Sequence, residues 1–418
     1  MYISRDVELL KKIGWKKFIK SRRKCGDFAD LSNLPHPAKR LLQHHKNHGA
    51  PVKFKMKAWS KSKLHAAITR GPHKSCHEHI TFLHEEFINM INKQQWIVLP
   101  YSVAKTLPGL YLSPPGVVPQ RGRRPQWIVD YSWYDVNVDT LPRAPSEAVQ
   151  FGHALDRILR EILLADPMLG PIYMLKLDIS DGFYCVNLAI EDIPHLGVVF
   201  PVADGEEPLV AFPLVLPMGW TSSPPIFSAA TETAADIANA DIKSNVPVPI
   251  HPLSTLAAMM DDPTPMPAST TNGTPLPNNQ PSPAAQVSAS TTIGTPSPNN
   301  QPSPAAQIYL CANHQYTAVP TVQDPSLPYS KKLAAYIDDI FDDFIGLSEG
   351  IHNRQRVRNI LLRAVDQIFC PIDFYDDEFC CEPLSLKNLK QGDMSWSTIK
   401  TVLGWVINTS TMTTVLSA

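Results

Sequence analysis

The spacing of apolar residues along the chain predicts a mixture of strands and helices. Short apolar runs bounded by turn residues predict strands at 172–177 (IYMLKL), 209–214 (LVAFPL) and 344–347 (FIGL). Apolar residues at helical spacing, or runs of good helix formers, predict helices at 82–93, 226–240 and 356–369. The region before these elements is expected to be mostly helical. Together they predict an α+β fold with an antiparallel sheet.

A proline-rich segment interrupts this pattern. Of the 40 prolines, 17 lie between Pro247 and Pro328, and the sequence at 268–286 recurs at 289–307 with two substitutions. No Asp, Glu, Lys or Arg occurs from 263 to 323. A segment with so few large apolar groups cannot offset its ordering entropy by burial. We therefore predict a disordered insertion at 245–328. The alternative is a Pro-rich ligand for a recognition domain.

The charge of the chain is unevenly distributed. The net charge is −1, but residues 1–72 hold 18 Lys and Arg against four acids, which indicates a polyanion partner. The chain has no apolar run of 18 residues and no secretory signal pattern, so we expect no membrane span and an intracellular location, cytoplasmic or nuclear. Seven cysteines without framework spacing favour reduced thiols.

A histidine-rich stretch offers one metal hypothesis. Cys76, His77, His79 and His84 could hold zinc, but no second ligand pair follows at finger-like spacing. Histidines on the surface or facing nucleic acid are the favoured interpretation.

Carboxylates at the ends of apolar strands are the strongest chemical signal. Asp178 ends the first predicted strand, and two acid pairs, 338–339 and 342–343, precede the last one. Adjacent buried carboxylates are costly unless a cation neutralises them. Carboxylates from distant segments could converge on two divalent ions, which suits phosphoryl transfer with Mg²⁺. Either cluster alone is also compatible with solvated acids in turns.

Five ordered blocks resemble the reverse transcriptases of retroelements. They are 116–131 with Asn137 (GVVPQRGRRPQWIVDY), 177–184 (LDISDGFY), 216–227 (LPMGWTSSPPIF), 342–347 (DDFIGL) and 402–406 (VLGWV). The resemblance covers about 82–406 without the insertion. Together with 95–100 (QWIVLP), the sequences of these blocks are most similar to those of retrotransposon enzymes of the tyrosine-recombinase (DIRS-like) kind.

The resemblance implies a right-hand polymerase fold, with fingers and an antiparallel palm sheet. The expected divisions are a basic N-terminal region (1–75), fingers (76–150), a first palm part (151–244), the insertion (245–328) and a second palm part with a truncated thumb (329–418). The implied activity is RNA-directed DNA polymerase, in which a primer 3′-hydroxyl attacks the α-phosphate of a deoxynucleotide. The implied partners are an RNA template, a DNA primer and dNTPs. Ribonuclease H and integrase or recombinase activities would come from elsewhere.

The resemblance also assigns roles to residues. Mg²⁺, or Mn²⁺ in its place, would be held by Asp178, the Ile179 carbonyl, Asp342 and Asp343. The nucleotide would contact Phe183 as a steric gate, together with Met218, Gly219, Arg121, Arg123, Arg124 and Gln126. The primer grip would comprise Leu403, Gly404 and Trp405. The basic stretch 11–24 would follow the template backbone.

The acid pair requires a choice. Asp338 and Asp339 fit the family's Tyr-x-Asp-Asp spelling and are the alternative pair, whereas only Asp342 and Asp343 lead directly into an apolar strand. We predict the second pair, because the first would place two more carboxylates inside that strand.

Two departures from the family support a second hypothesis. Gln126 occupies a position that is usually basic and that contacts the triphosphate, and only a dozen residues follow the last block. The alternative function is a catalytically decayed remnant that only binds nucleic acid.

Overall fold

The computed structural model describes most of the chain outside the proline-rich segment. The described residues are 3–24, 28–55, 58–122, 124–142, 153–166, 171–202, 205–244, 247–261, 335–340, 343–349, 351–370 and 383–417. The chain is mixed α and β, and its strands form several small sheets. This agrees with the α+β class that the sequence predicts.

The sheet that carries the candidate acids has three antiparallel strands. They are β5 (Ile172–Asp178), β9 (Asp343–Glu349) and β8 (Ala335–Ile340), and β9 lies in the middle. The strands predicted at 172–177 and 344–347 are confirmed. Because side chains alternate between the two faces of a strand, the odd and even positions of β5 point to opposite sides.

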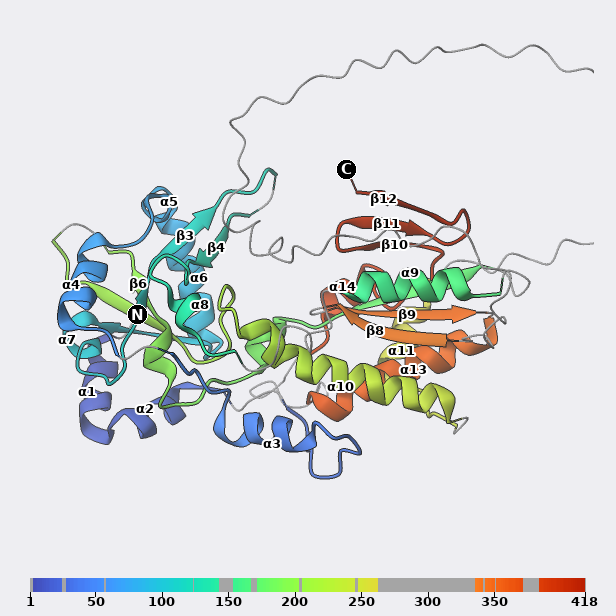
Figure 1. The fold of residues 1–418 in the computed structure, drawn as a ribbon, viewed down its shortest axis with the longest axis horizontal. Coiled ribbons are helices and arrows are strands. Elements are labelled where there is room, and N and C mark those ends of the chain that lie inside the picture. The colour runs from blue at the N-terminus through green and yellow to red at the C-terminus, as the bar shows by residue number, and fades with distance from the viewer. Residues whose placement is uncertain are drawn as a thin grey trace, which may run out of the picture. The chain divides into compact units, whose positions relative to one another are not determined.

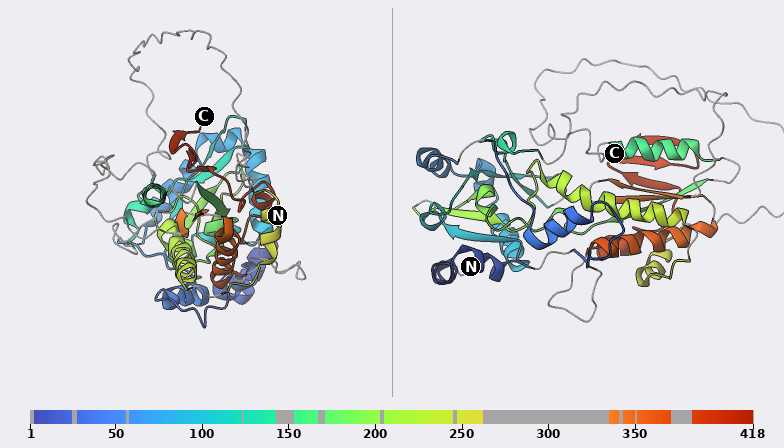
Figure 2. Two further views of the ribbon diagram at one scale, coloured as in Figure 1. Left: turned by 90° about the vertical axis from the view of Figure 1, so that its right-hand side faces the viewer. Right: turned by 60° about the horizontal axis from the view of Figure 1, so that its bottom comes forward.

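Helices cover both faces of this sheet (Figures 1 and 2). On one face lie α10 (Ser223–Lys243) and α13 (Ile351–Ile368), which pack on Leu175, Leu177 and Phe344. On the other face lies α9 (Ala154–Leu164), which shares a separate apolar cluster with Met174 and Ile345. The helices predicted at 226–240 and 356–369 are confirmed and are longer than predicted. Two prolines start α10, because the fixed φ of proline suits the first turn of a helix.

The N-terminal half forms a second group of elements. Its four-stranded sheet has the order β1-β7-β6-β2, and β3 pairs with β4 as an antiparallel hairpin. The strands are β1 (Trp96–Pro100), β2 (Leu112–Ser113), β3 (Pro115–Val118), β4 (Gln126–Val129), β6 (Gly197–Phe200) and β7 (Leu209–Pro213). The helices are α1 (Ile3–Ile13), α2 (Trp15–Arg22), α3 (Lys39–His48), α4 (Lys61–Arg70), α5 (Lys74–Glu78), α6 (Ile80–Asn92), α7 (Tyr101–Ala104), α8 (Val136–Asp139), η4 (Gly182–Cys185) and η5 (Ile193–Leu196). The predicted helical N-terminus, the helix at 82–93 and the strand at 209–214 are therefore confirmed.

The C-terminal residues form a three-stranded antiparallel sheet. Its strands are β10 (Ile399–Val402), β11 (Trp405–Asn408) and β12 (Thr413–Leu416), and α14 (Leu386–Lys390) precedes them. Val402 and Ile407 face the cluster around α9 and are buried. The sheet therefore packs over the same helix that covers the acid-bearing sheet (Figure 1).

One part of the predicted insertion is ordered. Residues 247–261 are described and include α11 (Pro252–Ala258), so the prediction of disorder from 245 onward was wrong for this stretch. Buried Leu253 and Ala257 pack in the main core, and the guanidinium of Arg358 binds Asp261. The proline-rich, charge-poor composition of this segment predicted disorder, although Leu253 and Ala257 are apolar residues that become buried. The rest of the predicted insertion, at 262–328, lies outside the described residues.

Candidate active site

Two predicted metal ligands lie directly opposite each other. Asp178 is the last residue of β5, Asp343 is the first residue of β9, and the two are Cα partners in the antiparallel pair. Directly opposed residues in such a pair have their Cβ atoms about 4.5–5.5 Å apart and point to the same face. The fold thus brings together two carboxylates that are far apart in sequence, at one end of the sheet.

Each of these carboxylates is held by a polar neighbour. The Lys176 ammonium lies 2.9 Å from Asp343 Oδ2, and the Asn388 side-chain amide donates a hydrogen bond to Asp178 Oδ2. Burial lowers the pKa of Lys176, but the hydrogen bond and charge of Asp343 outweigh this and leave the pKa raised. The site therefore contains a lysine that stays protonated beside Asp178 and Asp343.

Asn388 is positioned by a segment that runs along the outer edge of β5. The amide of Ser385 donates to the carbonyl of Asp178, and that of Ser180 donates to the carbonyl of Pro383. Ser385 also caps α14 by accepting from the Asn388 amide. This segment therefore fixes both the backbone and the carboxylate of Asp178.

The other two predicted metal ligands are the Ile179 carbonyl and the Asp342 carboxylate. Ile179 is buried and bridges Leu384, and the bridge uses the carbonyl of Asp178 rather than that of Ile179. The Ile179 carbonyl, which is the predicted ligand, therefore accepts no hydrogen bond in this bridge. Asp342 lies outside the described residues.

The alternative acid pair is placed differently. Asp338 and Asp339 are successive residues of β8, so they point to opposite faces of the sheet, and they are 4% and 2% exposed. Asp338 receives two hydrogen bonds from the Arg157 guanidinium, at 2.7 and 2.6 Å, and one from the Tyr336 hydroxyl at 2.8 Å. Asp339 Oδ2 lies 2.8 Å from the Thr231 hydroxyl on α10. Both carboxylates have structural partners within the sheet and its helices.

The predicted nucleotide pocket connects two distant segments. Gln126, at the start of β4, donates from its amide to the Met218 sulfur at 3.5 Å. The side chain of Asn137 bonds both the Gly219 carbonyl and the Thr221 amide, at 3.1 and 2.9 Å. Gly219 has φ +93°, and a Cβ there would lie 2.7 Å from the Val129 carbonyl. Glycine is therefore required where this loop passes the hairpin.

Phe183 follows Asp178 closely in sequence and is only partly buried. It stands on η4, a few residues after Asp178, and makes an edge-to-face contact with Phe227 at 5.6 Å. Its ring therefore has a packed neighbour and retains some exposed surface, as a residue in contact with substrate would require.

The three predicted arginines near position 126 differ in their surroundings. Arg124 pairs with Glu86 at 2.9 Å and lies over the Phe82 ring, whereas Arg121 is exposed. Arg123 lies outside the described residues. Gln126 itself bonds Gln120 at 3.0 Å.

The predicted primer grip is a tight hairpin turn. Leu403 and Gly404 join β10 to β11, and both have positive φ, +49° and +80°. Two central residues with positive φ are typical of a type I′ turn. Leu403 is 53% exposed at the tip, and Trp405 is half-buried.

The basic N-terminal stretch exposes the lysines of α1 and α2, whereas Arg22 is partly buried and pairs with Asp6. Phe18 and Ile19 of α2 are buried, whereas the lysines of α1 and α2 are exposed (Lys11, Lys12, Lys16, Lys17 and Lys20). This amphipathic arrangement leaves the lysines accessible to a polyanion.

The zinc hypothesis at the histidine-rich stretch does not fit the geometry. Cys76 is fully buried, its thiol donates to the Pro115 carbonyl, and burial raises its pKa to about 12. A zinc ligand would need the thiolate. Among the described residues, no three His, Cys, Asp or Glu side chains are grouped closely enough to hold a metal. The predicted magnesium site has two such carboxylates in place, and its third lies outside the described part.

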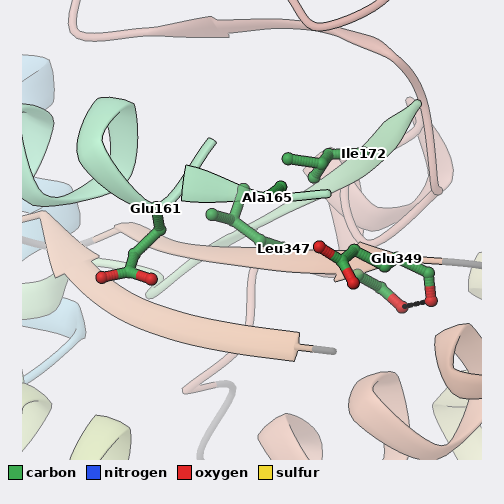
Figure 3. A pocket seen from close by; sticks show the side chains of 6 residues that line it. Glu161, Ala165, Ile172, Leu347 and Glu349 are labelled. Carbon is green, nitrogen blue, oxygen red and sulfur yellow. Dashed lines mark hydrogen bonds between the residues drawn. The ribbon is translucent and has the colours of Figure 1, made fainter. Parts of the chain in front are cut away.

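The cavities that the structure describes lie elsewhere. A cavity of ≈ 10 Å³ at the far end of the sheet, lined by Glu161, Ala165, Ile172, Leu347, Ser348 and Glu349, has room for at most one water (Figure 3). A larger cleft of ≈ 550 Å³ lies between α5–α6 and the ends of β6 and β7. Neither is lined by a predicted catalytic or nucleotide-binding residue.

Sequence reasoning missed three residues of the site. Lys176 had a usable signal, because it precedes Asp178 by two residues and so shares its face of β5. Asn388 and Arg157 had none, since their partners are far away in sequence.

No protein-family model matches the chain, and no curated protein is significantly similar to it. Within the described residues, no helix has the length and apolar character needed to cross a bilayer.

Proposed function

We propose that this chain is the core of a retrotransposon reverse transcriptase, an RNA-directed DNA polymerase with a fingers and palm architecture. The observation that carries the proposal is the alignment of Asp178 opposite Asp343 at the end of an antiparallel sheet. Two helices cover one face of that sheet. These acids belong to two blocks that resemble the catalytic motifs, and the resemblance implies that they hold the same Mg²⁺ ions.

The chain's own residues would perform three tasks. The carboxylates of Asp178 and Asp343, with Asp342, would hold Mg²⁺. When bound, two Mg²⁺ ions activate the attacking hydroxyl and stabilise the leaving pyrophosphate. The partly exposed ring of Phe183 would exclude a 2′-hydroxyl by steric clash. The exposed lysines of α1 and α2 would bind the template backbone.

The nucleotide would lie against the loop of Met218 and Gly219. Support comes from the contacts that join this loop to Gln126 of β4 and to Asn137 of α8. These contacts hold the loop beside the hairpin. A base or sugar bound there would contact residues from both predicted blocks.

A second candidate is favoured by one observation. The amide of Gln126 is engaged with Gln120 and Met218, and Arg124 is engaged with Glu86. A charge-assisted contact to phosphate is about twice as strong as a neutral one. A chain with this neutral residue could bind nucleic acid without catalysing transfer.

Primer extension tests the proposal. The full chain would extend a DNA primer on an RNA template in Mg²⁺ and then in Mn²⁺, beside Asp343→Asn, Asp338→Asn and Asp181→Asn. The last is a matched control, because Asp181 is an exposed carboxylate paired only with exposed Lys93 in the described structure. We expect Asp343→Asn to lower the rate at least about a hundredfold and Asp181→Asn to retain it.

The outcomes separate the candidates. Extension that survives Asp343→Asn would refute the predicted ligand set, and loss only in a folded Asp338→Asn variant would favour the alternative pair. A folded wild type that binds RNA without extending a primer would support the second candidate. Restored extension by Gln126→Arg would then identify the missing basic contact.

A further inference from the structure

Lys176 is the common cation of three carboxylates. Its ammonium contacts Asp343 at 2.9 Å and interacts electrostatically with Asp178 and Asp393. The lysine side chain is 27% exposed and that of Asp343 16% exposed, so solvent screens their interaction only in part. An ammonium here neutralises the same acid that the proposed function assigns to a divalent cation.

Asp393 offers this ammonium a second position. The following residue, Met394, donates its amide to the Lys176 carbonyl at 2.6 Å, which places Asp393 beside β5. The Oδ2 atom of Asp393 is buried and has no hydrogen-bond partner among the described residues. A buried carboxylate oxygen without a partner is costly, so an approaching ammonium would be favoured there.

We propose that Lys176 is an exchangeable counter-ion, which neutralises Asp343 in the metal-free site and moves to Asp393 when a divalent cation binds. The proposal rests on the proposed function, because it assumes that Asp343 is a metal ligand. The cation and the ammonium compete for the same oxygen, so Lys176 lowers the metal affinity. Asp393 offsets part of this effect by accepting the displaced ammonium.

Direct binding of Mn²⁺, measured by electron paramagnetic resonance of the free ion, tests the exchange without relying on activity. The proteins are wild type, Lys176→Met, Asp393→Asn, the double variant and Asp343→Asn. We expect Lys176→Met to bind Mn²⁺ about tenfold more tightly, because one competing charge is removed. Asp393→Asn should bind several-fold more weakly, because the ammonium loses its second acceptor.

The double variant distinguishes exchange from a structural role. Once Lys176 is methionine, Asp393→Asn should leave Mn²⁺ affinity unchanged, whereas a general disturbance of the fold would persist in both backgrounds. Lys400→Met is the matched control. It removes another cation that interacts with Asp393, and its ammonium bonds Gly392 and Ser395. We expect it to change the affinity less than threefold. Thermal melting confirms that each variant is folded.

The two levels of failure are separable. Equal Mn²⁺ affinity in wild type and Lys176→Met, with binding lost in Asp343→Asn, would overturn the exchange and leave the metal site standing. An effect of Asp393→Asn that persists without Lys176 would also overturn it. Absence of Mn²⁺ binding in both wild type and Lys176→Met would overturn the exchange and the proposed metal site together.

Discussion

The carboxyl group of Asp339 should make the stability of this protein depend on pH near neutrality. Its side chain is 2% exposed and faces α10, where the Thr231 hydroxyl lies 2.8 Å away. Burial, followed by the charges of Glu232 and Asp338, raises the pKa of Asp339 from 3.8 to about 7, although the hydrogen bond from Thr231 lowers it. Asp339→Asn replaces this acid with a neutral group of the same shape.

The sign and size of the effect follow from proton binding. Between pH 4 and pH 7 the unfolded chain has lost the Asp339 proton while the folded chain keeps it, so stability falls as pH rises. The fall ends near pH 7, where the folded carboxyl also ionises. A pKa difference of one costs about 1.4 kcal/mol, so the full loss is about 4 kcal/mol. Asp339→Asn cannot lose a proton and should avoid this loss.

Urea unfolding of wild type and Asp339→Asn at intervals between about pH 3.5 and about pH 8 measures the difference, because this interval includes both pKa values of Asp339. The difference in the free energy of unfolding, variant minus wild type, should increase up to about pH 7 and then stay constant. Thr231→Val removes the hydroxyl that lowers this pKa, so its loss of stability should continue to higher pH. Parallel curves for wild type and Asp339→Asn over the whole range would refute the reasoning.

Three further substitutions test other contacts by urea unfolding. Arg157→Leu leaves the 4% exposed Asp338 without its guanidinium and should lower the free energy of unfolding by about 3 kcal/mol, part of which Asp338→Asn should restore in the double variant. Gly219→Ala adds a Cβ 2.7 Å from the Val129 carbonyl at φ +93° and should cost about 1–2 kcal/mol, whereas no change would show that the loop relaxes freely. Leu403→Gly relieves a leucine at φ +49° in an exposed turn and should stabilise the chain by about 1 kcal/mol, and a loss would mean that the exposed leucine has a packing role.

Local structure was predictable where the apolar pattern was strong. The strands at 172–177 and 344–347 and the helix at 226–240 appear close to their predicted bounds, because burial on one or both faces determines the pattern directly. The short helix α11 was missed, since its few apolar anchors stand among prolines whose composition indicates disorder.

Long-range pairing could be predicted only in part. The sequence indicated that Asp178 and the later acids would approach each other, but not that Asp178 would align with Asp343 rather than a neighbouring residue. Register depends on how the two strands pack on their helices, and a shift of one residue would turn Asp343 to the other face. The partners of the acids were equally hidden. Asn388 and Arg157 lie on short or unpredicted helices far from them in sequence.

Each described acid of the two clusters has a polar or charged partner from the chain itself, so these carboxylates do not depend on a metal to be held in the fold. The four partners are an amide, a guanidinium, a hydroxyl and an ammonium (Asn388, Arg157, Thr231 and Lys176). These partners differ in how easily a cation could displace them. The planar guanidinium holds Asp338 with two bonds, and burial favours the neutral form of Asp339.

The ammonium that pairs with Asp343 stands at the end of a flexible stem, and the amide at Asp178 is neutral. We therefore expect both to be displaced more easily than the guanidinium that holds Asp338 with two bonds. We expect the fold to form without a divalent ion and to leave Asp343, which is 16% exposed, more accessible to one than Asp338 and Asp339, which are 4% and 2% exposed. The easier access of a cation to Asp343 favours the pair Asp342 and Asp343 over Asp338 and Asp339 on physical grounds that are independent of any resemblance.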